Sequence, residues 1–224
     1  MIRITPVDHM SNLFGPSRKE IEDIQSRLSQ VEQERDILCK EMVEVRELLH
    51  HLDQEKSLLL MALERLRPGM DHRVLAETLL ELVFKPLNLA SFYVAIADYP
   101  ADMLHWVIYH EGGRARNTPS RSMTDEGGLT AKAILAHKPL YIRTLEEAKA
   151  EGAQFSEAER ISGLVPQSWY GIPLGWGERP FGQVSFQSFQ PDAFSMETRR
   201  LMDALANLLA MAMRMPMDVW KGEV

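Results

Sequence analysis

The sequence predicts an α+β protein, in which helices flank an antiparallel sheet and a long coiled-coil helix precedes that domain. A heptad repeat over residues 21–66 indicates the coiled coil. Strand-like segments come in pairs joined by short turns, 91–97 with 104–109 and 168–176 with 179–189. Because amphipathic helical patterns stand before, between and after these pairs, the hairpins and helices are typical of the α+β class.

The composition narrows the classes of protein that the chain can belong to. With 224 residues there is enough chain for one ordinary domain plus an extension. The formal net charge of −7, without a cluster of Lys and Arg, argues against a nucleic-acid partner. No apolar run of about 18 residues and no signal peptide is found, so we expect a cytoplasmic protein without a membrane span. The single cysteine excludes an intramolecular disulfide and a multi-cysteine metal site, and we expect no metal.

The heptad repeat begins after a capping box, Ser17 with Glu20 three residues later. We expect a flexible arm over residues 1–16 and a helix over residues 17–67. Such a helix is roughly 70 Å long, more than a small domain can cover, so a second copy of the chain is the expected partner. Twelve of the fourteen a and d positions are apolar and form the expected dimer seam: Ile21, Ile24, Leu28, Val31, Leu38, Met42, Val45, Leu49, Leu52, Leu59, Leu63 and Leu66.

Charges beside the seam favour a parallel homodimer. In a parallel, in-register pair Arg27 faces Glu32 of the other copy and Glu41 faces Arg46, which gives two attractive pairs. Two other arrangements stay open: the helix packs back on its own domain, or the wider apolar stripe near its end joins a local four-helix arrangement. Cys39 lies at an e position, and we interpret it as a small residue beside the seam rather than a redox sensor.

Proline and glycine at positions 68 and 69 end the repeat, and the domain is expected over residues 70–215, with a tail over residues 216–224. Its two middle helices begin at capping boxes, Thr144 with Glu147 and Ser156 with Glu159, and Ser195 caps the closing helix. The expected elements are, in order, a helix over 71–84, strands over 91–97 and 104–109, a polar loop over 112–121, a helix over 127–136, a strand over 140–143, two short helices, strands over 168–176 and 179–189, and a helix over 196–213.

Three segments of this domain carry a family resemblance: GGLTAKAILAHKPLYI (127–142), YGIPLGWGERPFGQVSFQSFQPDAF (170–194) and RRLMDALANLLAMAM (199–213). They contain a glycine-led helix ending in Lys-Pro before a short strand, a Pro-Leu strand, a tight turn, a Gly-Val strand and a Phe-capped closing helix. On these grounds residues 70–214 resemble a GAF domain, a ligand-sensing module of bacterial signalling proteins. The resemblance implies a GAF-like sheet with its first and last helices on one face, and with middle loops and helices over a small-molecule pocket on the other.

By this family geometry, the candidate ligand site lies at the strand edges and middle loops. Aromatic side chains would give an apolar floor, arginines could pair with an anion, and helix N–H groups after the two glycines could bind one as well. The alternative is that the tryptophans pack in the core and the arginines are solvated. The candidate residues are Trp106, Tyr109, His110, Arg114, Arg116, Gly127, Gly128, Trp169 and Tyr170. His105 and His110, five residues apart, are expected on opposite faces of a regular strand and are poor joint ligands.

The departures from ligand-binding and enzymatic relatives shape the functional expectation. The Asn-Lys and Asp-Glu pairs of cyclic-nucleotide-binding members are missing, and the domain lacks the cysteine that bilin-binding members and free methionine sulfoxide reductases use. We expect a non-enzymatic signalling or regulatory homodimer that senses a small molecule or a partner protein and acts on another protein in trans. The alternative is a structural scaffold with a ligand-free domain. Neither the ligand nor any cofactor is identified by the sequence.

Overall fold

The computed structural model describes residues 17–126, 128–155, 163, 165–175 and 179–213. The expected N-terminal arm, C-terminal tail, Gly127 and the capping box of Ser156 with Glu159 lie outside these residues. The chain divides into two compact units. The first ends at Gln54, and the second, which contains the sheet, begins at Glu55.

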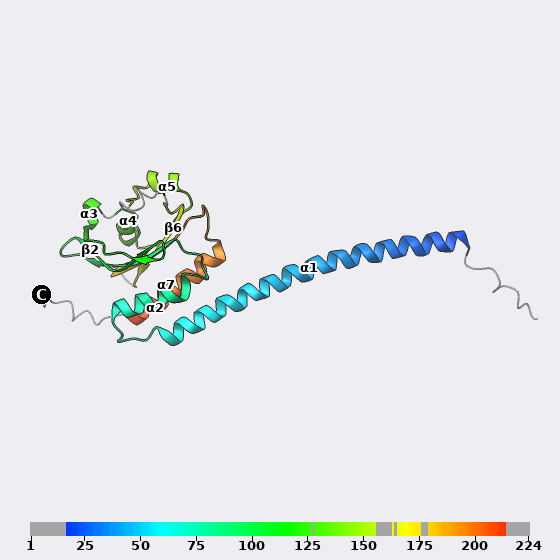
Figure 1. Ribbon diagram of the computed structural model, residues 1–224, viewed down its shortest axis with the longest axis horizontal. Helices are drawn as coiled ribbons and strands as arrows, with labels where there is room; N and C mark the ends of the chain where they lie inside the picture. The colour runs from blue at the N-terminus through cyan, green and yellow to red at the C-terminus, as the bar shows by residue number, and fades with distance from the viewer. Residues whose placement is uncertain (1–16, 127, 156–162, 164, 176–178, 214–224) are drawn as a thin grey trace, which may run out of the picture. The chain divides into compact units, whose positions relative to one another are not determined.

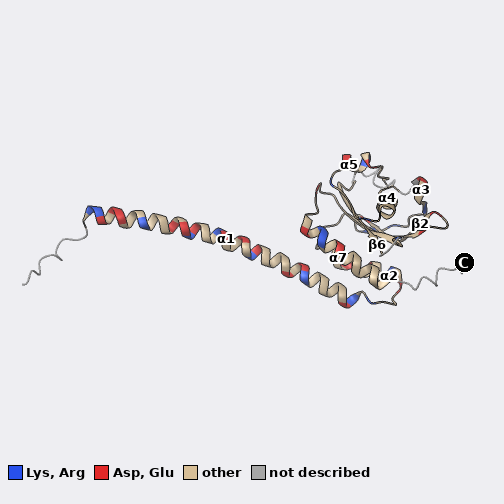
Figure 2. Ribbon diagram, turned by 180° about the vertical axis from the view of Figure 1, so that it is seen from behind, with Lys and Arg blue, Asp and Glu red and all other residues tan. Residues whose placement is uncertain are grey.

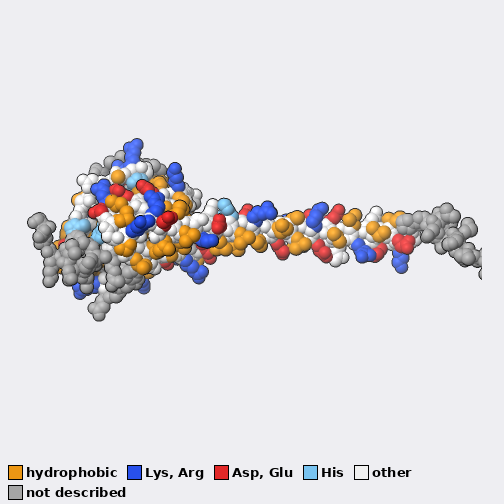
Figure 3. All heavy atoms as spheres, turned by 90° about the horizontal axis from the view of Figure 1, so that it is seen from below, with side chains coloured by type: hydrophobic (Ala, Val, Ile, Leu, Met, Phe, Trp, Pro, Cys, Tyr) orange, Lys and Arg blue, Asp and Glu red, His pale blue; other side chains and the backbone are white. Residues whose placement is uncertain are grey.

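The long helix is confirmed as α1 (Arg18–Arg65). Its start shows the expected cap, because the Ser17 N–H donates to the Glu20 carboxylate at 2.7 Å and the Glu20 N–H points to Ser17 Oγ at 3.4 Å. This bonding lowers the pKa of Glu20. Acidic and basic residues are interspersed along the helix (Figure 2), and hydrophobic side chains lie exposed between them (Figure 3). Among the described residues no helix is long and apolar enough to cross a membrane.

The second unit has the predicted α+β fold, with helices on both faces of one antiparallel sheet (Figure 1). Within the described residues the strands lie in the order β3-β2-β1-β7-β6-β5, and β4 pairs with β2. Helices α2 and α7 cover one face, and α4 and α5 lie over the other. The elements are α2 (His72–Val83), β1 (Ser91–Asp98), β2 (Met103–Glu111), β3 (Arg114–Ala115), β4 (Arg121–Ser122), α3 (Met123–Glu126), α4 (Gly128–Ala136), β5 (Leu140–Ile142), α5 (Leu145–Ala150), β6 (Ser168–Leu174), β7 (Gly182–Ser188) and α7 (Met196–Met213).

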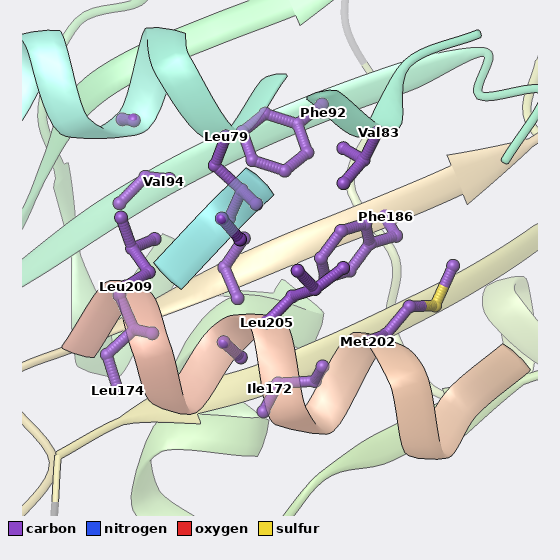
Figure 4. Close-up of a cluster of buried hydrophobic side chains, with 14 of the residues drawn as sticks. Leu79, Val83, Phe92, Val94, Ile172, Leu174, Phe186, Met202, Leu205 and Leu209 are labelled. Carbon is purple, nitrogen blue, oxygen red and sulfur yellow. The ribbon is translucent and has the colours of Figure 1, made fainter. Parts of the chain in front are cut away.

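The main hydrophobic core lies between the sheet and the α2–α7 pair (Figure 4). Side chains of alternate strand positions, such as Phe92 and Phe186, meet the apolar faces of the two helices, because successive strand residues point to opposite faces of a sheet. The last turns of α1 contribute as well, since Leu58, Ala62 and Leu66 are buried in the same cluster. This unit therefore includes the end of the long helix.

That packing changes the end of the expected seam. Leu66 is only 5% exposed and Leu59 packs against the core, so both side chains face their own domain rather than an open stripe. The other ten seam residues, from Ile21 to Leu63, remain exposed. An apolar stripe available to a second helix therefore ends at Leu63.

An irregularity in β2 decides which of its side chains face which helix layer. The β1–β2 register shifts between Val94 and Ala95, where Val94 pairs with Ile108 and Ala95 with Trp106, leaving Val107 as an extra residue. Because of this bulge, two β2 residues that lie three positions apart on either side of Val107 point to the same face of the sheet. It also brings His105 and His110 to the same face, since their partners on β1, Ile96 and Phe92, both belong to the main core. The expectation of opposite faces, which assumed a regular strand, is wrong.

Candidate functional site

The face of the sheet under α4 holds a small cavity of about 70 Å³. Six sheet residues line it: Tyr93 on β1, Trp106 and Tyr109 on β2, Arg121 on β4, Trp169 on β6 and Gln187 on β7. The start of α4 adds Gly128, Leu129 and Thr130, and the chain after α5 closes the other side with Ala153, Gln154 and Phe155. The described lining is thus mainly aromatic, with a few polar groups.

The aromatic side chains hold one another in place. Tyr93 stacks on Tyr109, with ring centroids 5.3 Å apart and planes 6° from parallel. Trp106 meets Tyr93 edge to face at 5.0 Å and Tyr109 at 5.7 Å. These contacts depend on the β2 bulge, because Trp106 and Tyr109 would face opposite ways on a regular strand. The cavity therefore has a rigid aromatic wall.

A buried hydrogen-bonded chain joins three of the lining elements. The Trp169 indole Nε1 donates to Tyr93 Oη at 3.0 Å, and Tyr93 Oη lies 2.8 Å from Thr130 Oγ1. All three side chains are buried. Since buried polar groups need partners, this chain ties β6, β1 and α4 together beneath the cavity.

Arg121, on β4, is the only charged residue in the described lining. Its guanidinium carbon lies 6.0 Å from the centroid of the Trp106 ring, and its Nη1 donates a long hydrogen bond of 3.4 Å to Gln154 Oε1. None of the ion pairs between described residues includes Arg121. Its positive charge is therefore not neutralised by a carboxylate in this part of the chain.

The cavity face of β7 carries a row of buried polar side chains, Gln183, Ser185 and Gln187. Gln183 is fully buried, and in the described part of the chain neither its Nε2 nor its Oε1 has a hydrogen-bond partner. Gly171 on β6 makes room for it, because a Cβ there would lie 2.0 Å from Gln183 Nε2 and 2.0 Å from Trp169 Cη2. A glycine is thus required for the amide and the indole to share this space.

Four of the predicted site residues line this cavity: Trp106, Tyr109, Gly128 and Trp169. Gly128 has a φ of 53°, and a Cβ there would meet Gln154 Cγ at 3.4 Å, so a glycine suits both its backbone and its neighbour. Gly127 lies outside the described residues. Geometry therefore brings together the aromatic part of the predicted set.

Two other predicted residues lie on the opposite face of the sheet. Tyr170 follows Trp169 on β6 and must point the other way, where it packs in the main core and donates to Asp203 Oδ1 of α7 at 2.8 Å. Burial and that carboxylate raise the pKa of Tyr170, so its phenol is neutral. His110 also faces α2, with its ring edge to face against Phe84 at 5.2 Å. Neither side chain reaches the cavity.

The predicted arginines lie away from the cavity. Arg116 pairs with the buried Glu111 carboxylate, at 3.0 Å, and lines a separate open groove of about 500 Å³ beside α2. His110, Trp106 and Tyr109 line the same groove. Arg114 is exposed on the two-residue strand β3 and lies in neither hollow. The cationic side chain that lines the cavity is therefore Arg121 rather than either predicted arginine.

Sequence reasoning missed Tyr93, Arg121 and Gln187 as lining residues. For β7 a signal was present, because Gln183, Ser185 and Gln187 alternate with Val184 and Phe186 and so mark a polar face. Tyr93 alternates in the same way with its apolar neighbours on β1. Arg121 stands at the end of a polar loop and carries no comparable signal.

The groups in the described lining differ from those of a metal site. No group of three or more His, Cys, Asp or Glu side chains in the described ranges could hold a metal ion. The lining offers aromatic faces, hydroxyl and amide groups and one guanidinium, which are groups that bind and orient a ligand.

Comparisons with known proteins agree with this fold. The GAF domain family model matches residues 69–214. A GAF domain from a phosphoenolpyruvate-protein phosphotransferase of Coxiella burnetii superimposes with a TM-score of 0.59 at 12% identity, over 71% of this chain and 92% of that one. The free methionine-R-sulfoxide reductase of Neisseria meningitidis, solved with its substrate, gives a TM-score of 0.58 at 12% identity, over 70% and 87%. A GAF domain from A. aeolicus in an inactive state gives 0.53 at 16% identity, over 70% and 94%.

No curated protein matches the chain. At these low identities the solved structures establish the fold alone. The family model covers well over half of the sequence, and its limits enclose the whole sheet with α2 and α7. The chain therefore belongs to the GAF domain family.

Proposed function

We propose that this chain is a non-enzymatic regulatory GAF-domain protein that forms a homodimer through a parallel coiled coil of α1. Its domain senses a small molecule or a partner protein, and the response passes to another protein in trans. The observation that carries the proposal is the exposed heptad stripe of ten apolar side chains between Ile21 and Leu63. Each contributes about 1.5–3 kcal/mol when fully buried, so a second helix along the stripe is strongly favoured.

The charges beside the stripe support the parallel arrangement. Among the ion pairs of the described residues, none uses Arg27, Glu32, Glu41 or Arg46, so all four are available to a second copy. Arg35, at an a position, pairs instead with its neighbour Asp36 at 2.8 Å. A charged a position favours two strands over more, because higher oligomers bury that position more deeply.

The non-enzymatic part of the proposal rests on residue chemistry. The only cysteine, Cys39, is exposed on α1 and lies outside residues 69–214, so cysteine chemistry in the domain is ruled out by sequence. The cavity lining offers binding groups rather than a nucleophile with a neighbouring base.

Transmission can use α1 itself, because its last turns belong to the domain core. Leu58, Ala62 and Leu66 pack in the cluster that α2 and α7 share. A change in the packing of this layer shifts the end of a helix that continues without interruption to Arg18. Helix shifts of this kind are a common form of conformational signal.

Dimerisation is tested by measuring the molar mass of the whole chain by light scattering at micromolar concentration. We expect a dimer, and a monomer for the double variant Leu38→Asp/Val45→Asp, which places charges in the seam. Gln33→Asp/Lys40→Asp, with both changes at f positions, is the matched control and stays dimeric. A monomeric wild-type protein would refute the coiled-coil dimer.

Orientation is tested by cross-linking in a Cys39→Ser background. Val45→Cys places a thiol at a d position, where the two copies meet side by side in a parallel, in-register dimer, so oxidation should join them. Gln33→Cys, at an outward f position, is the control and should not cross-link. Failure of the Val45→Cys variant to cross-link, with dimerisation intact, would indicate an antiparallel or shifted pair.

A structural scaffold is the second candidate, favoured by the size of the cavity. Ligand sites commonly measure about 300–1,000 Å³, whereas this cavity holds about 70 Å³. Native mass spectrometry of the purified protein separates the candidates, since a co-purified small molecule supports sensing. A pull-down with wild-type protein and the Leu38→Asp/Val45→Asp variant then shows whether a partner protein requires the coil.

A further inference from the structure

We propose that the cavity beneath α4 binds a short-chain carboxylate, whose carboxylate group pairs with Arg121 and whose short body lies against the aromatic wall. This inference rests on the sensing part of the proposed function and names the chemical class of its ligand. Three features of the lining carry it: charge, volume and the distribution of polar groups.

The charge of the lining favours an anion. Arg121 is its only charged residue among those described, and its contacts there are a long hydrogen bond to Gln154 and a distant approach to the Trp106 ring. A guanidinium that lacks a carboxylate partner can bind a ligand carboxylate by donating two parallel N–H···O hydrogen bonds in one plane. A cationic ligand would meet like charge at Arg121 and no acidic side chain in the described lining.

The volume restricts the body of the ligand. A cavity of about 150 Å³ is known to hold benzene, and each water takes about 10–15 Å³ of such space. The 70 Å³ available here is about half of that volume and corresponds to about five water-sized groups. Nucleotides and tetrapyrroles are therefore too large, and a short alkyl or oxo acid is of the right size.

Polar groups inside the cavity suit the same class. Gln187 is 6% exposed, and its Nε2 reaches Ser185 Oγ only at 3.5 Å, beyond an ordinary N–H···O bond. Its amide can therefore serve a carboxylate or oxo oxygen within the cavity. The N-terminal end of α4 lines the same space at Gly128, and the positive end of a helix dipole also favours an anion. Trp106 and Trp169 offer apolar surface to a short alkyl chain.

The test is an NMR titration of the full-length protein with three probes of similar size. Propionate is the carboxylate, propionamide its uncharged counterpart and propylammonium the cation. The indole N–H signals of Trp106 and Trp169 report on the cavity directly. We expect propionate to shift both signals and to bind about tenfold more tightly than the other two probes. Equal binding of propionamide, or no shift with propionate at its solubility limit, would overturn the proposal.

Variants of arginine residues test whether the positive charge of Arg121 binds the carboxylate. Arg121→Gln keeps hydrogen-bonding capacity and removes the charge, so it should weaken propionate binding about tenfold and leave propionamide unchanged. Arg114→Gln is the matched control on an exposed arginine outside the cavity, and it should have no effect. If Arg121→Gln fails to fold, Arg121→Lys keeps the charge without the two-bond geometry and should weaken binding by a smaller factor. Unchanged binding in Arg121→Gln, or a loss in Arg116→Gln instead, refutes the assignment.

The molar mass of each sample is measured alongside the titration. A dimer that binds no propionate refutes the ligand class and leaves the dimeric regulatory assignment intact. A monomer that binds propionate refutes the coiled-coil dimer and leaves the cavity assignment intact.

Discussion

The two faces of the sheet differ in how their residues are packed. The face toward α2 and α7 carries one continuous cluster of buried apolar side chains, which includes the end of α1. The face toward α4 carries two small clusters, one around Leu129 and Trp169 and one around Leu104 and Ile134. Between them lie the polar row of β7 and the cavity. One face forms the main apolar core, and the other has less apolar contact because it contains the polar row and the cavity.

The difference between the two faces explains why a central strand such as β7 carries both apolar and polar residues. Positions of β7 that face α7, such as Val184 and Phe186, are apolar, and those that face α4 are polar. Polar side chains that are buried and poorly paired destabilise a fold. The main core must therefore supply most of the stability that the cavity face lacks.

The largest contrast is expected between equivalent truncations on the two faces. Leu205→Ala on α7 removes a fully buried side chain from the main core and should cost about 4 kcal/mol of unfolding free energy. Leu129→Ala, beside the cavity, should cost about 2 kcal/mol, because fewer contacts are lost. Urea denaturation of both variants at one fixed protein concentration gives the comparison. Equal losses would show that the cavity face is as tightly packed as the core.

Glycines in the neighbouring strands β6 and β7 test how closely their surroundings are packed. A Cβ at Gly182 would lie 2.3 Å from the Ala95 carbonyl oxygen, so Gly182→Ala forces two backbones apart and should cost about 3 kcal/mol. Gly171→Ala meets only side chains, Gln183 and Trp169, and should cost about 1–2 kcal/mol while displacing the indole. Thermal unfolding measures the first effect, and the Trp169 indole signal reports the second. If Gly171→Ala changed neither the stability nor the Trp169 indole signal, the side chains of the cavity wall would be able to move without a measurable cost.

The buried amide of Gln183 tests whether the cavity face sacrifices stability. Gln183→Met keeps the volume and removes two polar atoms that lack partners in the described chain, so it should stabilise the fold by about 1 kcal/mol. Gln54→Met, at an exposed site on α1, is the control and should change stability by less than about 0.5 kcal/mol. Destabilisation by Gln183→Met would show that water satisfies the amide, which would extend the polar region beyond the cavity.

Much of the fold was predictable because its signals are local. The capping box of α1 and the Thr144 and Ser195 caps of α5 and α7 are short-range hydrogen bonds, and all three form. At α5 the Glu147 carboxylate accepts from the Arg143 N–H, one residue before the Thr144 N–H that a capping box uses. Strand-like segments joined by short turns also located the hairpins. The observed ends of several elements differ from the predicted ends by a residue or two. The loop predicted over 112–121 contains the two-residue strand β3 and the first residue of β4. The sequence did not predict these short strands, because their pairing depends on the strand beside them rather than on intrinsic propensity.

The site was predictable only in part, because it depends on register. Trp106 and Tyr109 point to the same face of the sheet only because of the bulge at Val107, and no local sequence pattern predicted that bulge. Tyr170 was grouped with Trp169 although neighbours on a strand point apart. Arg121 reaches the cavity through the pairing of β4 with β2, a tertiary contact that follows a polar loop. Residue type was thus foreseen better than residue position.

The smallest effect concerns a titratable group on the apolar face. The His110 ring packs against Phe84, its Nδ1 has no hydrogen-bond partner in the described chain, and burial lowers its pKa. Arg73, Glu77 and Arg116 line the groove beside it. The unfolded chain, with an ordinary pKa near 6.5, therefore binds a proton before the folded protein does.

The contribution of His110 to stability is therefore fully present above pH 6.5 and is lost as the pH falls through that value toward the lower folded pKa. Replacing it by His110→Gln should make the unfolding free energy less dependent on pH across that window. His51→Gln, on the exposed surface of α1, is the control and should keep the wild-type slope. Chemical denaturation between about pH 5 and pH 8 measures the slopes. An unchanged slope in His110→Gln would show that the ring titrates as it does in water, and that the apolar face is open to solvent at its edge.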